Sequence, residues 1–332
     1  MALGKTIAAG VFAANLFLCA CADLRPIGTL TTGGRGGAGG AGSTGAAGAG
    51  GVGTGGTMDA GGGGVDGGFA DPAIRVLVWN NALTWGHASR ALAIPHLRAR
   101  ELTDNVRFDT AYAHTGSNYQ DGPTDTAFDA SVFTDQGLDN YDVVMFLVTT
   151  GNTIDDAMKT VRRQALQDFI EKKGRGFVGV HSATDTYQNA QNHPNDPKDP
   201  WPWYVDFIGA NYLSHTFYGT PGVAQYFQNM THPILIAAGT PTIWNRSEEW
   251  FVFTRDPQSS PIPGVKILLT CHDQIDATER PSAWVHEMPP QASAPRGGRM
   301  FYTAFGHFTS AFEEPLVMDL IIAGIKWAAG RL

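Results

Sequence analysis

Several histidines stand at places in the sequence where side chains can do chemistry. Four of them follow apolar stretches of strand type or begin polar turns: His87, His181, His232 and His307. A fifth, His215, follows a short element. One carboxylate, Glu249, belongs to an acidic–aromatic segment. Imidazoles and a carboxylate at one edge of a sheet allow three uses: binding of a divalent metal, general acid–base catalysis, or hydrogen bonding to a polar ligand.

These uses assign different roles to the same residues. For acid–base catalysis the candidates are His181, His232, Glu249 and His307. For a zinc-like divalent metal they are His181 and His307, but no compact His-x-x-x-His signature is present, so a metal depends on proximity in the fold alone. Two of the histidines also have a purely structural alternative: His232 as a turn residue before Pro233, and His307 as a hydrogen-bonded residue at a strand end.

His181 has the most informative surroundings. An apolar run over residues 177–180 stops abruptly at His181-Ser182, and small residues flank this pair. The carboxyl end of a central strand is where ligands bind in parallel α/β sheets. A serine nucleophile needs a base and an oxyanion hole, and His181 occupies the apex of the turn. We therefore assign Ser182 to substrate binding, and expect Asp185 to order the loop or to accept a hydrogen bond from a substrate hydroxyl.

Other side chains are candidates for contact with a substrate. The expected binding set is completed by His87, His215 and Trp284. An exposed tryptophan can stack on a sugar ring, although aromatic residues in a chain of this size are usually part of the core. The tryptophans considered for stacking are Trp85, Trp201, Trp250 and Trp284.

The elements that must position these residues alternate between strand and helix. Apolar runs predict buried strands at 74–79, 141–148 and 177–180, and alternation predicts another at 106–113. Helices are expected around 91–97 and over 154–173, the second with Thr153 as its N-cap and Gly174 just after its end. This order predicts an α/β fold with a parallel sheet, right-handed crossovers and flanking helices.

The C-terminal part is expected to add strands to this sheet. Strand candidates lie at 223–227, 248–253, 265–271, 282–286 and 299–306. A short helix is expected at 203–208 and a final helix at 315–329. Cys271 lies within a β-branched run and is expected to be a buried small side chain.

The first 72 residues are expected to lie outside the folded domain, which spans 73–332. Residues 1–20 have the pattern of a signal peptide, because the apolar run at 6–18 is too short for a bilayer core of about 30 Å. Its end, Leu18-Cys19-Ala20-Cys21, resembles the bacterial lipobox, which implies cleavage before Cys21 and lipidation of its sulfur. The alternative is an ordinary cleaved signal.

Residues 21–72 are rich in glycine and predict a flexible tether. We therefore expect an extracytoplasmic protein that is lipid-anchored in a bacterial cell envelope, at the outer membrane or cell surface. The chain has 23 Lys and Arg against 31 Asp and Glu, a net charge of −8, and no basic run. Because nucleic-acid binding calls for clustered Lys and Arg, we expect no nucleic-acid partner. Through the lipid anchor, the membrane is an expected partner.

From residue 74 to the end, the chain resembles the ThuA-like (trehalose-utilisation) family, a branch of the class I glutamine amidotransferase-like superfamily. Segments in family order carry the resemblance: Gly86-His87, Tyr141–Val144, Gly176–Asp185, Ser214-His215, Thr231–Pro233, Glu248–Trp250, Pro281–Trp284 and Gly298–His307. The resemblance implies a flavodoxin-like core and a link to carbohydrate metabolism, often of keto-disaccharides or glycosides.

Two departures from the sequence pattern of the superfamily and the family affect the expected chemistry. The position of the amidotransferase cysteine nucleophile is occupied by His181, and the second glycine of that turn is Ala183. Glutaminase chemistry by that route is therefore not available. The family's Asp-Glu-x-Tyr is replaced by Glu248-Glu249-Trp250-Phe251, which retains the acidic role of Glu249.

The sequence therefore predicts a cell-envelope ThuA-like protein that acts on carbohydrates or keto-glycosides by His-based acid–base or metal-assisted chemistry. The reaction would be of lyase, hydrolase or isomerase type, with His181 and either His232 or His307 moving protons and Glu249 as the orienting or basic partner. The alternative is a non-catalytic glycan-binding module, for which a tether is equally natural.

Overall fold

The computed structural model describes residues 72–110, 129–187, 199–216, 220–226, 229–273 and 278–332. The chain divides into two units, Met1–Gly63 and Gly64–Leu332, and all described residues belong to the second. The expected signal peptide, Cys21, nearly all of the expected tether and the end of the strand expected at 106–113 lie outside them. Within the described ranges, no helix is both long and apolar enough to cross a membrane.

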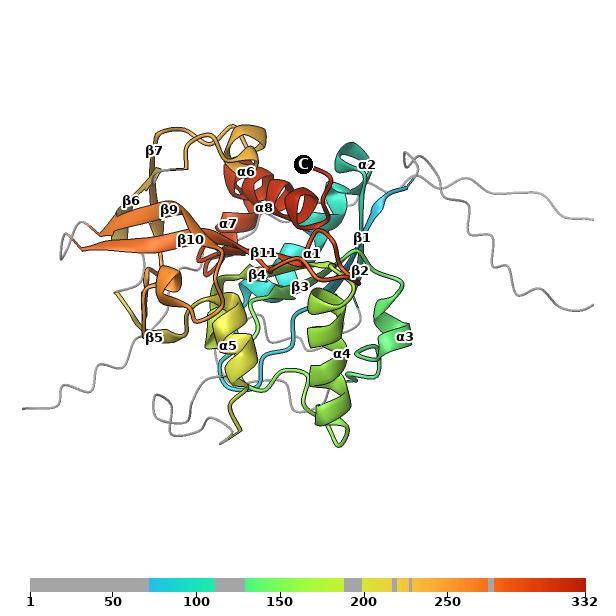
Figure 1. Ribbon diagram of the computed structural model, residues 1–332. Helices are drawn as coiled ribbons and strands as arrows, with labels where there is room; N and C mark the ends of the chain where they lie inside the picture. Colours follow the sequence, from blue (N-terminus) through green and yellow to red (C-terminus); the bar gives the residue numbers. More distant parts are fainter. Residues whose placement is uncertain (1–71, 111–128, 188–198, 217–219, 227–228, 274–277) are drawn as a thin grey trace, which may run out of the picture. The chain divides into compact units, whose positions relative to one another are not determined.

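A nine-stranded sheet forms the centre of the described residues (Figure 1). Its order is β2-β1-β3-β4-β11-β10-β9-β6-β7. The first five strands in this order are mutually parallel: β2 (Val106–Thr110), β1 (Ile74–Trp79), β3 (Val143–Leu147), β4 (Gly176–Val180) and β11 (Arg299–Thr303). The other four continue antiparallel: β10 (Glu279–Glu287), β9 (Val265–Asp273), β6 (Thr220–Tyr226) and β7 (Ile243–Glu248). The predicted α/β class with added C-terminal strands is confirmed.

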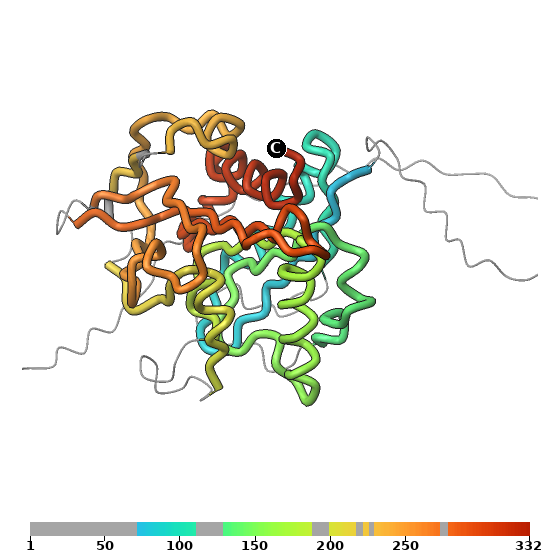
Figure 2. Tube along the Cα trace, viewed as in Figure 1, coloured from blue at the N-terminus to red at the C-terminus, as the bar shows by residue number. Residues whose placement is uncertain are grey.

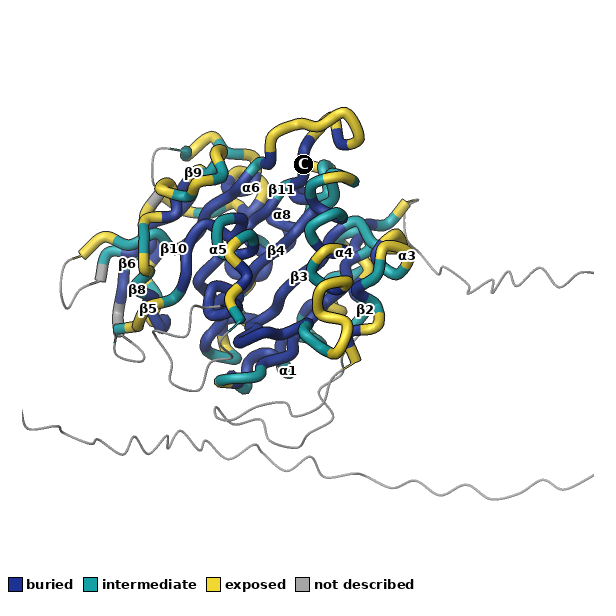
Figure 3. Tube along the Cα trace, turned by 60° about the horizontal axis from the view of Figure 1, so that its bottom comes forward, coloured by how far each residue is buried: buried dark blue, intermediate teal, exposed yellow. Residues whose placement is uncertain are grey.

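Helices cover both faces of the sheet, as the alternation of strand side chains requires. In β1, Val76 and Val78 pack on one face with α1 (Ser89–Ala99) and α8 (Pro315–Ala328). Leu77 and Trp79 pack on the other. There they meet α3 (Asp135–Leu138), α4 (Lys159–Glu171) and α5 (Pro202–Ile208). Figure 3 shows the strands buried between these layers, with exposed positions on the outer helices and loops.

The long helix after β3 starts later than its apolar periodicity predicts. It begins at Lys159, and its N-cap is Met158. Thr153, the expected N-cap, instead accepts a hydrogen bond from the indole of Trp79 at 2.9 Å and donates to the carbonyl of Asn81 at 2.6 Å. These tertiary bonds hold residues before the helix against the loop that follows β1, so the prediction of the N-cap was wrong.

The antiparallel strands extend the same sheet beside the parallel ones (Figure 2). The strand expected at 248–253 is in fact interrupted: β7 ends at Glu248, and β8 (Phe251–Phe253) pairs with β5 (Tyr212–His215) in a separate two-stranded sheet. The break leaves Glu249 between two strands. The remaining short elements are α2 (Glu101–Asp104), η1 (His181–Asp185), α6 (Pro233–Ala237), η2 (Pro257–Ser259) and α7 (Ser310–Glu313).

Close packing of α8 on β11 gives a stability prediction. A Cβ added at Gly324 would lie 2.1 Å from Cδ1 of Phe301. We expect Gly324→Ala to lower the free energy of unfolding by about 1–2 kcal/mol, because overpacking exceeds the helix-propensity gain of roughly 1 kcal/mol. Denaturant unfolding measures the effect. Adding Phe301→Leu to Gly324→Ala should cost less than the two single losses together. A stabilised Gly324→Ala protein would contradict this packing.

Candidate functional site

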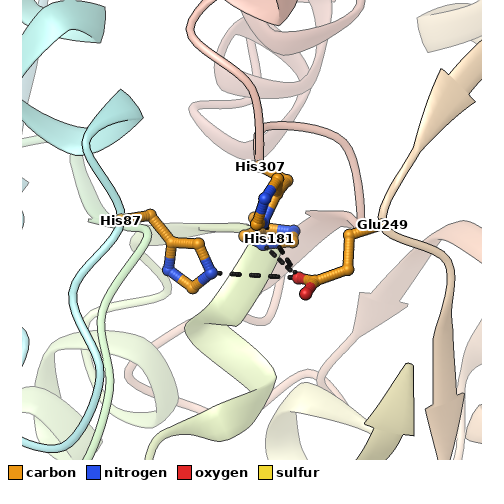
Figure 4. Close-up of side chains that lie close together, drawn as sticks. All are labelled: His87, His181, Glu249 and His307. Carbon is orange, nitrogen blue, oxygen red and sulfur yellow. Dashed lines mark ion pairs between the residues drawn. The ribbon is translucent and has the colours of Figure 1, made fainter. Parts of the chain in front are cut away.

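Three histidines reach one point from the carboxyl ends of parallel strands. His87 lies in the loop between β1 and α1, His181 directly follows β4, and His307 lies in the loop after β11. Parallel strands bring these ends to the same edge of the sheet. Glu249 arrives from the break between β7 and β8, so the antiparallel extension supplies the carboxylate (Figure 4).

One carboxylate oxygen lies at the centre of this cluster, which comprises His87, His181, Glu249 and His307. Oε2 of Glu249 is 3.1 Å from Nε2 of His181, 3.1 Å from Nδ1 of His307 and 3.8 Å from Nε2 of His87. One ligand-type atom from each of the four residues lies within 4.8 Å of the other three, and all four residues are buried. The rings of His87 and His307 meet edge to face, with centroids 4.9 Å apart.

His181 occupies a turn conformation that side chains rarely adopt. Its φ of 52° lies in the left-handed region, which costs a non-glycine residue about 1–2 kcal/mol. The tight turn is held by Tyr302, whose hydroxyl donates to the carbonyl oxygen of His181 at 2.7 Å. Nδ1 of the imidazole lies 2.9 Å from the carbonyl oxygen of Ala304. A carbonyl can only accept, so Nδ1 carries the proton and Nε2 points at Glu249.

The electrostatics of the cluster favour an ionised carboxylate and a neutral His87. Burial alone would raise the pKa of Glu249, but the neighbouring imidazoles of His181 and His307 hold this pKa well below its usual value. Burial lowers the pKa of His87 well below its usual value, and the neighbouring imidazoles of His181 and His307 lower it further. The cluster thus combines one carboxylate with three closely spaced imidazoles.

Glu248, the neighbour of Glu249, has a role that the sequence did not reveal. Its fully buried carboxylate accepts hydrogen bonds from the backbone N–H groups of Gly306 (3.1 Å), His307 (3.2 Å) and Glu249 (3.2 Å). Nη2 of Arg246 donates to it at 2.9 Å. Glu248 therefore fixes the backbone that carries two residues of the cluster. The available signal was two adjacent acidic residues that end a strand containing one arginine.

The other expected binding residues lie around the cluster with different exposures. His215 is the most open, with 32% of its side chain exposed and Nε2 3.4 Å from Oε1 of Glu249. Nδ1 of His215 lies 2.7 Å from the carbonyl oxygen of Thr216. Ser182 is buried, and its hydroxyl makes no hydrogen bond with the described residues. Asp185 is also buried, and its backbone carbonyl accepts from the N–H of Gly151 at 3.1 Å.

Two expected site residues are not part of the cluster. His232 is the N-cap of α6: its Nδ1 accepts from the N–H of Ile234 at 3.3 Å, and its ring lies 5.5 Å from that of Trp327. The structure places His232 in a helix cap and not in the cluster, because the His-Pro turn begins a helix that packs on α8. Trp284 is fully buried, with its indole donating to the carbonyl of Ile208 at 2.7 Å. No face of this ring is available for a sugar.

Two kinds of chemistry fit the cluster of His87, His181, Glu249 and His307. The imidazoles can transfer protons to and from a bound substrate, since their ordinary pKa lies near neutral pH. Three nitrogens and one carboxylate oxygen are also a ligand set suited to zinc and similar divalent ions. A cysteine nucleophile is absent from this turn, as the sequence shows, because His181 occupies the apex.

Comparison with known proteins identifies the family. The family described as ThuA, trehalose utilisation, matches residues 75–328. The chain therefore belongs to the ThuA family. Comparison with curated protein sequences gave no match.

Two solved structures share this fold. A putative ThuA-like protein from Bacteroides uniformis is 19% identical, with a TM-score of 0.55 over 80% of this chain and 95% of that one. A second, from Parabacteroides merdae, is 16% identical, with a TM-score of 0.53 over 77% and 90%. The glutaminase domain of Trypanosoma brucei CTPS is more distant, at 11% identity and a TM-score of 0.40 over 78% and 94%.

The buried carboxylate of Glu248 gives the next prediction. Glu248→Gln retains the side-chain volume but removes the charge opposite Arg246 and one of the two acceptor oxygens. We expect the free energy of unfolding to fall by about 3–5 kcal/mol, because one partner of a buried pair is left unbalanced. The matched control is Glu314→Gln. Glu314 pairs with the same arginine at 3.2 Å, but its side chain is 33% exposed, so the loss should be at most about 1 kcal/mol. Equal losses would contradict the assigned role.

The cap formed by His232 gives a pH prediction. Burial, with a smaller contribution from the charge of Lys266, lowers the pKa of His232 to about 4. Below about pH 6.5 the unfolded chain takes up a proton at this histidine that the folded chain does not. Stability should therefore decrease as the pH falls from 6.5 toward 4, by less than about 1.4 kcal/mol per pH unit because the ring is partly exposed.

His232→Asn isolates this contribution, since asparagine can cap the helix without titrating. Denaturant unfolding at pH 7 and pH 5 measures both proteins. The wild type should lose more stability than His232→Asn over this interval. An identical loss in the two proteins would show that His232 is not held neutral by the fold.

Proposed function

We propose that this chain is an enzyme that acts on a carbohydrate or keto-glycoside at the cluster of His87, His181, Glu249 and His307. The observation that carries this proposal is the convergence of three imidazoles on one buried carboxylate oxygen. Buried titratable groups gathered at the carboxyl edge of a parallel sheet are characteristic of catalytic sites. The family description, trehalose utilisation, supports a sugar as the substrate.

The proposed reaction starts with proton transfer at a sugar carbon next to a carbonyl. An imidazole of the site takes the proton from that carbon. The electrons of the C–H bond form a carbon–carbon double bond, and the carbonyl electron pair moves onto its oxygen. Return of a proton restores the carbonyl, so no oxidant or reductant is needed. Positive charge near the carbonyl oxygen stabilises the intermediate and lowers the barrier.

The positions of the aromatic side chains favour an enzyme over a glycan-binding module. A binding module needs exposed rings on which sugars stack. Trp250 and Trp284 are at most 1% exposed and Trp201 is 7% exposed, whereas Trp85 is 45% exposed. Three of the four tryptophans considered for stacking are thus part of the interior and cannot stack on a sugar. The polar side chains of His87, His181 and His307, in contrast, converge on Glu249.

The proposed location is the bacterial cell envelope, with the folded domain outside the cytoplasm. The support is the sequence pattern at the N-terminus: a short apolar run, the lipobox-like segment ending at Cys21, and the glycine-rich stretch that follows. A tethered enzyme at the surface would meet sugars before their uptake.

Hydrogen exchange tests the proposed proton transfer without requiring the final product to be known. With a 3-keto-glucoside in D₂O, the wild-type chain should catalyse exchange of the hydrogen next to the carbonyl, followed by NMR. His181→Ala should slow this exchange by at least about 100-fold, because the variant removes one of the three imidazoles that define the site, and loss of a group needed for proton transfer has an effect of this size. Circular dichroism confirms that the variant is folded.

His232→Asn is the matched control, because this histidine lies outside the cluster; at pH 7.5 its exchange rate should equal that of the wild type. Binding of the keto-sugar without exchange or turnover would overturn the enzyme proposal in favour of a glycan-binding module. Undiminished exchange in His181→Ala would overturn the assignment of the site.

A further inference from the structure

We infer that His87, His181, His307 and Glu249 are the ligands of one divalent metal ion of the zinc class. The presence of this ion follows from the geometry of the four side chains alone. Its use as the positive charge that faces the substrate carbonyl rests on the proposed function.

The tautomer of His181 is the first reason. Its Nδ1–H donates to the carbonyl of Ala304, so Nε2 of the neutral ring carries a lone pair. That lone pair points at Oε2 of Glu249 from 3.1 Å, and this oxygen is itself an acceptor. Nε2 of His181 makes no hydrogen bond within the described residues. Two buried lone pairs at this distance require a cation between them, either a proton or a metal ion.

The number of imidazoles decides between these cations. Nitrogens of His307 and His87 approach the same oxygen, at 3.1 and 3.8 Å. A proton bridge would leave His181 charged and His87 and His307 as neutral N–H donors, so that a buried imidazolium would face the carboxylate and three nitrogens would serve one oxygen. A single divalent ion satisfies all three nitrogens while the rings stay neutral.

The distances fit a metal of this size. Ligands about 2.0–2.1 Å from a zinc-like ion lie roughly 3.3 Å apart in tetrahedral geometry. The two shorter separations, 3.1 Å each, and the overall spread of 4.8 Å bracket this value. Three imidazole nitrogens and one carboxylate oxygen suit zinc, cobalt, nickel or iron, whereas calcium and magnesium prefer oxygen ligands.

The surrounding hydrogen bonds orient the ligands as they do in known metal sites. The carbonyl of Ala304 fixes the ring of His181. Glu248 accepts hydrogen bonds from the backbone N–H groups of His307 and Glu249, and so orients both residues. His215 approaches the outer oxygen of Glu249, at 3.4 Å.

This arrangement separates two roles within the proposed reaction. With His87, His181 and His307 engaged by the metal, their nitrogens cannot carry the substrate proton. The partly exposed His215 is then the residue that takes up and returns it. A divalent ion held by His87, His181, His307 and Glu249 would supply positive charge for a substrate carbonyl.

Metal binding to the full chain tests the inference directly. Protein purified in the presence of zinc, then dialysed against metal-free buffer, should retain one ion per chain by elemental analysis. Cobalt(II) added to chelator-treated protein should produce a visible absorption band that saturates at one equivalent. His181→Ala and His307→Gln should each weaken zinc affinity by more than about 100-fold, because each removes a ligand. His232→Asn should bind zinc as the wild type does.

Several results would overturn the inference. These are a folded wild-type chain that retains no zinc and gives no cobalt band, or zinc affinity unchanged in both ligand variants. Exchange of the keto-sugar hydrogen at full rate in chelator-treated protein would show that the metal takes no part in the reaction. The proposed function would still hold.

Zinc binding without any hydrogen exchange would instead overturn the proposed function while supporting the metal site. His215→Gln should keep one zinc per chain and lose exchange by at least about 100-fold. Full exchange in that variant would exclude His215 as the proton carrier.

Discussion

Two adjacent carboxylates, Glu248 and Glu249, are buried where β7 ends beside the loop that follows β11, and each needs positive charge nearby. Isolated carboxylates are not tolerated in a protein interior. Glu248 is balanced by Arg246 and three backbone N–H groups. Within the described residues, all the side chains that form ion pairs with Glu249 are imidazoles. The geometry of the loops that carry these histidines therefore depends on what neutralises Glu249.

The fold provides this balance by joining two kinds of sheet. The parallel strands β1, β4 and β11 bring their following loops to one edge, and each loop contributes one histidine. The antiparallel strands add the acidic side chains and Arg246. The turn after the central strand β4 presents His181 with a left-handed backbone, which directs its imidazole toward Glu249.

Much of the fold could be predicted because its strands have simple patterns. β3 and β4 are buried on both faces and occur as uninterrupted apolar runs, and β1 departs from this only at Arg75, whereas β7 is a polar edge strand without such a pattern. The start of α4 was missed because Thr153 is held by Trp79 and Asn81, which are distant in sequence. No local pattern contains that information.

The same distinction explains which site residues were found. His181 follows a strongly apolar strand, and its position at the strand tip indicates a site. His232 precedes a proline after a polar turn, a pattern shared by reactive loops and by helix starts, and only the packing of α6 on α8 decides between them. Glu248 acts through backbone groups of Gly306 and His307, nearly sixty residues further along, so its role becomes visible only in three dimensions.

The central claim is that four residues from four separate segments form one cation-binding centre. X-ray diffraction from crystals grown with zinc, collected just above and just below the zinc absorption edge, tests this claim most directly. The account predicts one strong anomalous peak within bonding distance of His87, His181, His307 and Glu249. A zinc-replete crystal with no peak among these side chains, or with its strongest peak elsewhere on the chain, would contradict it.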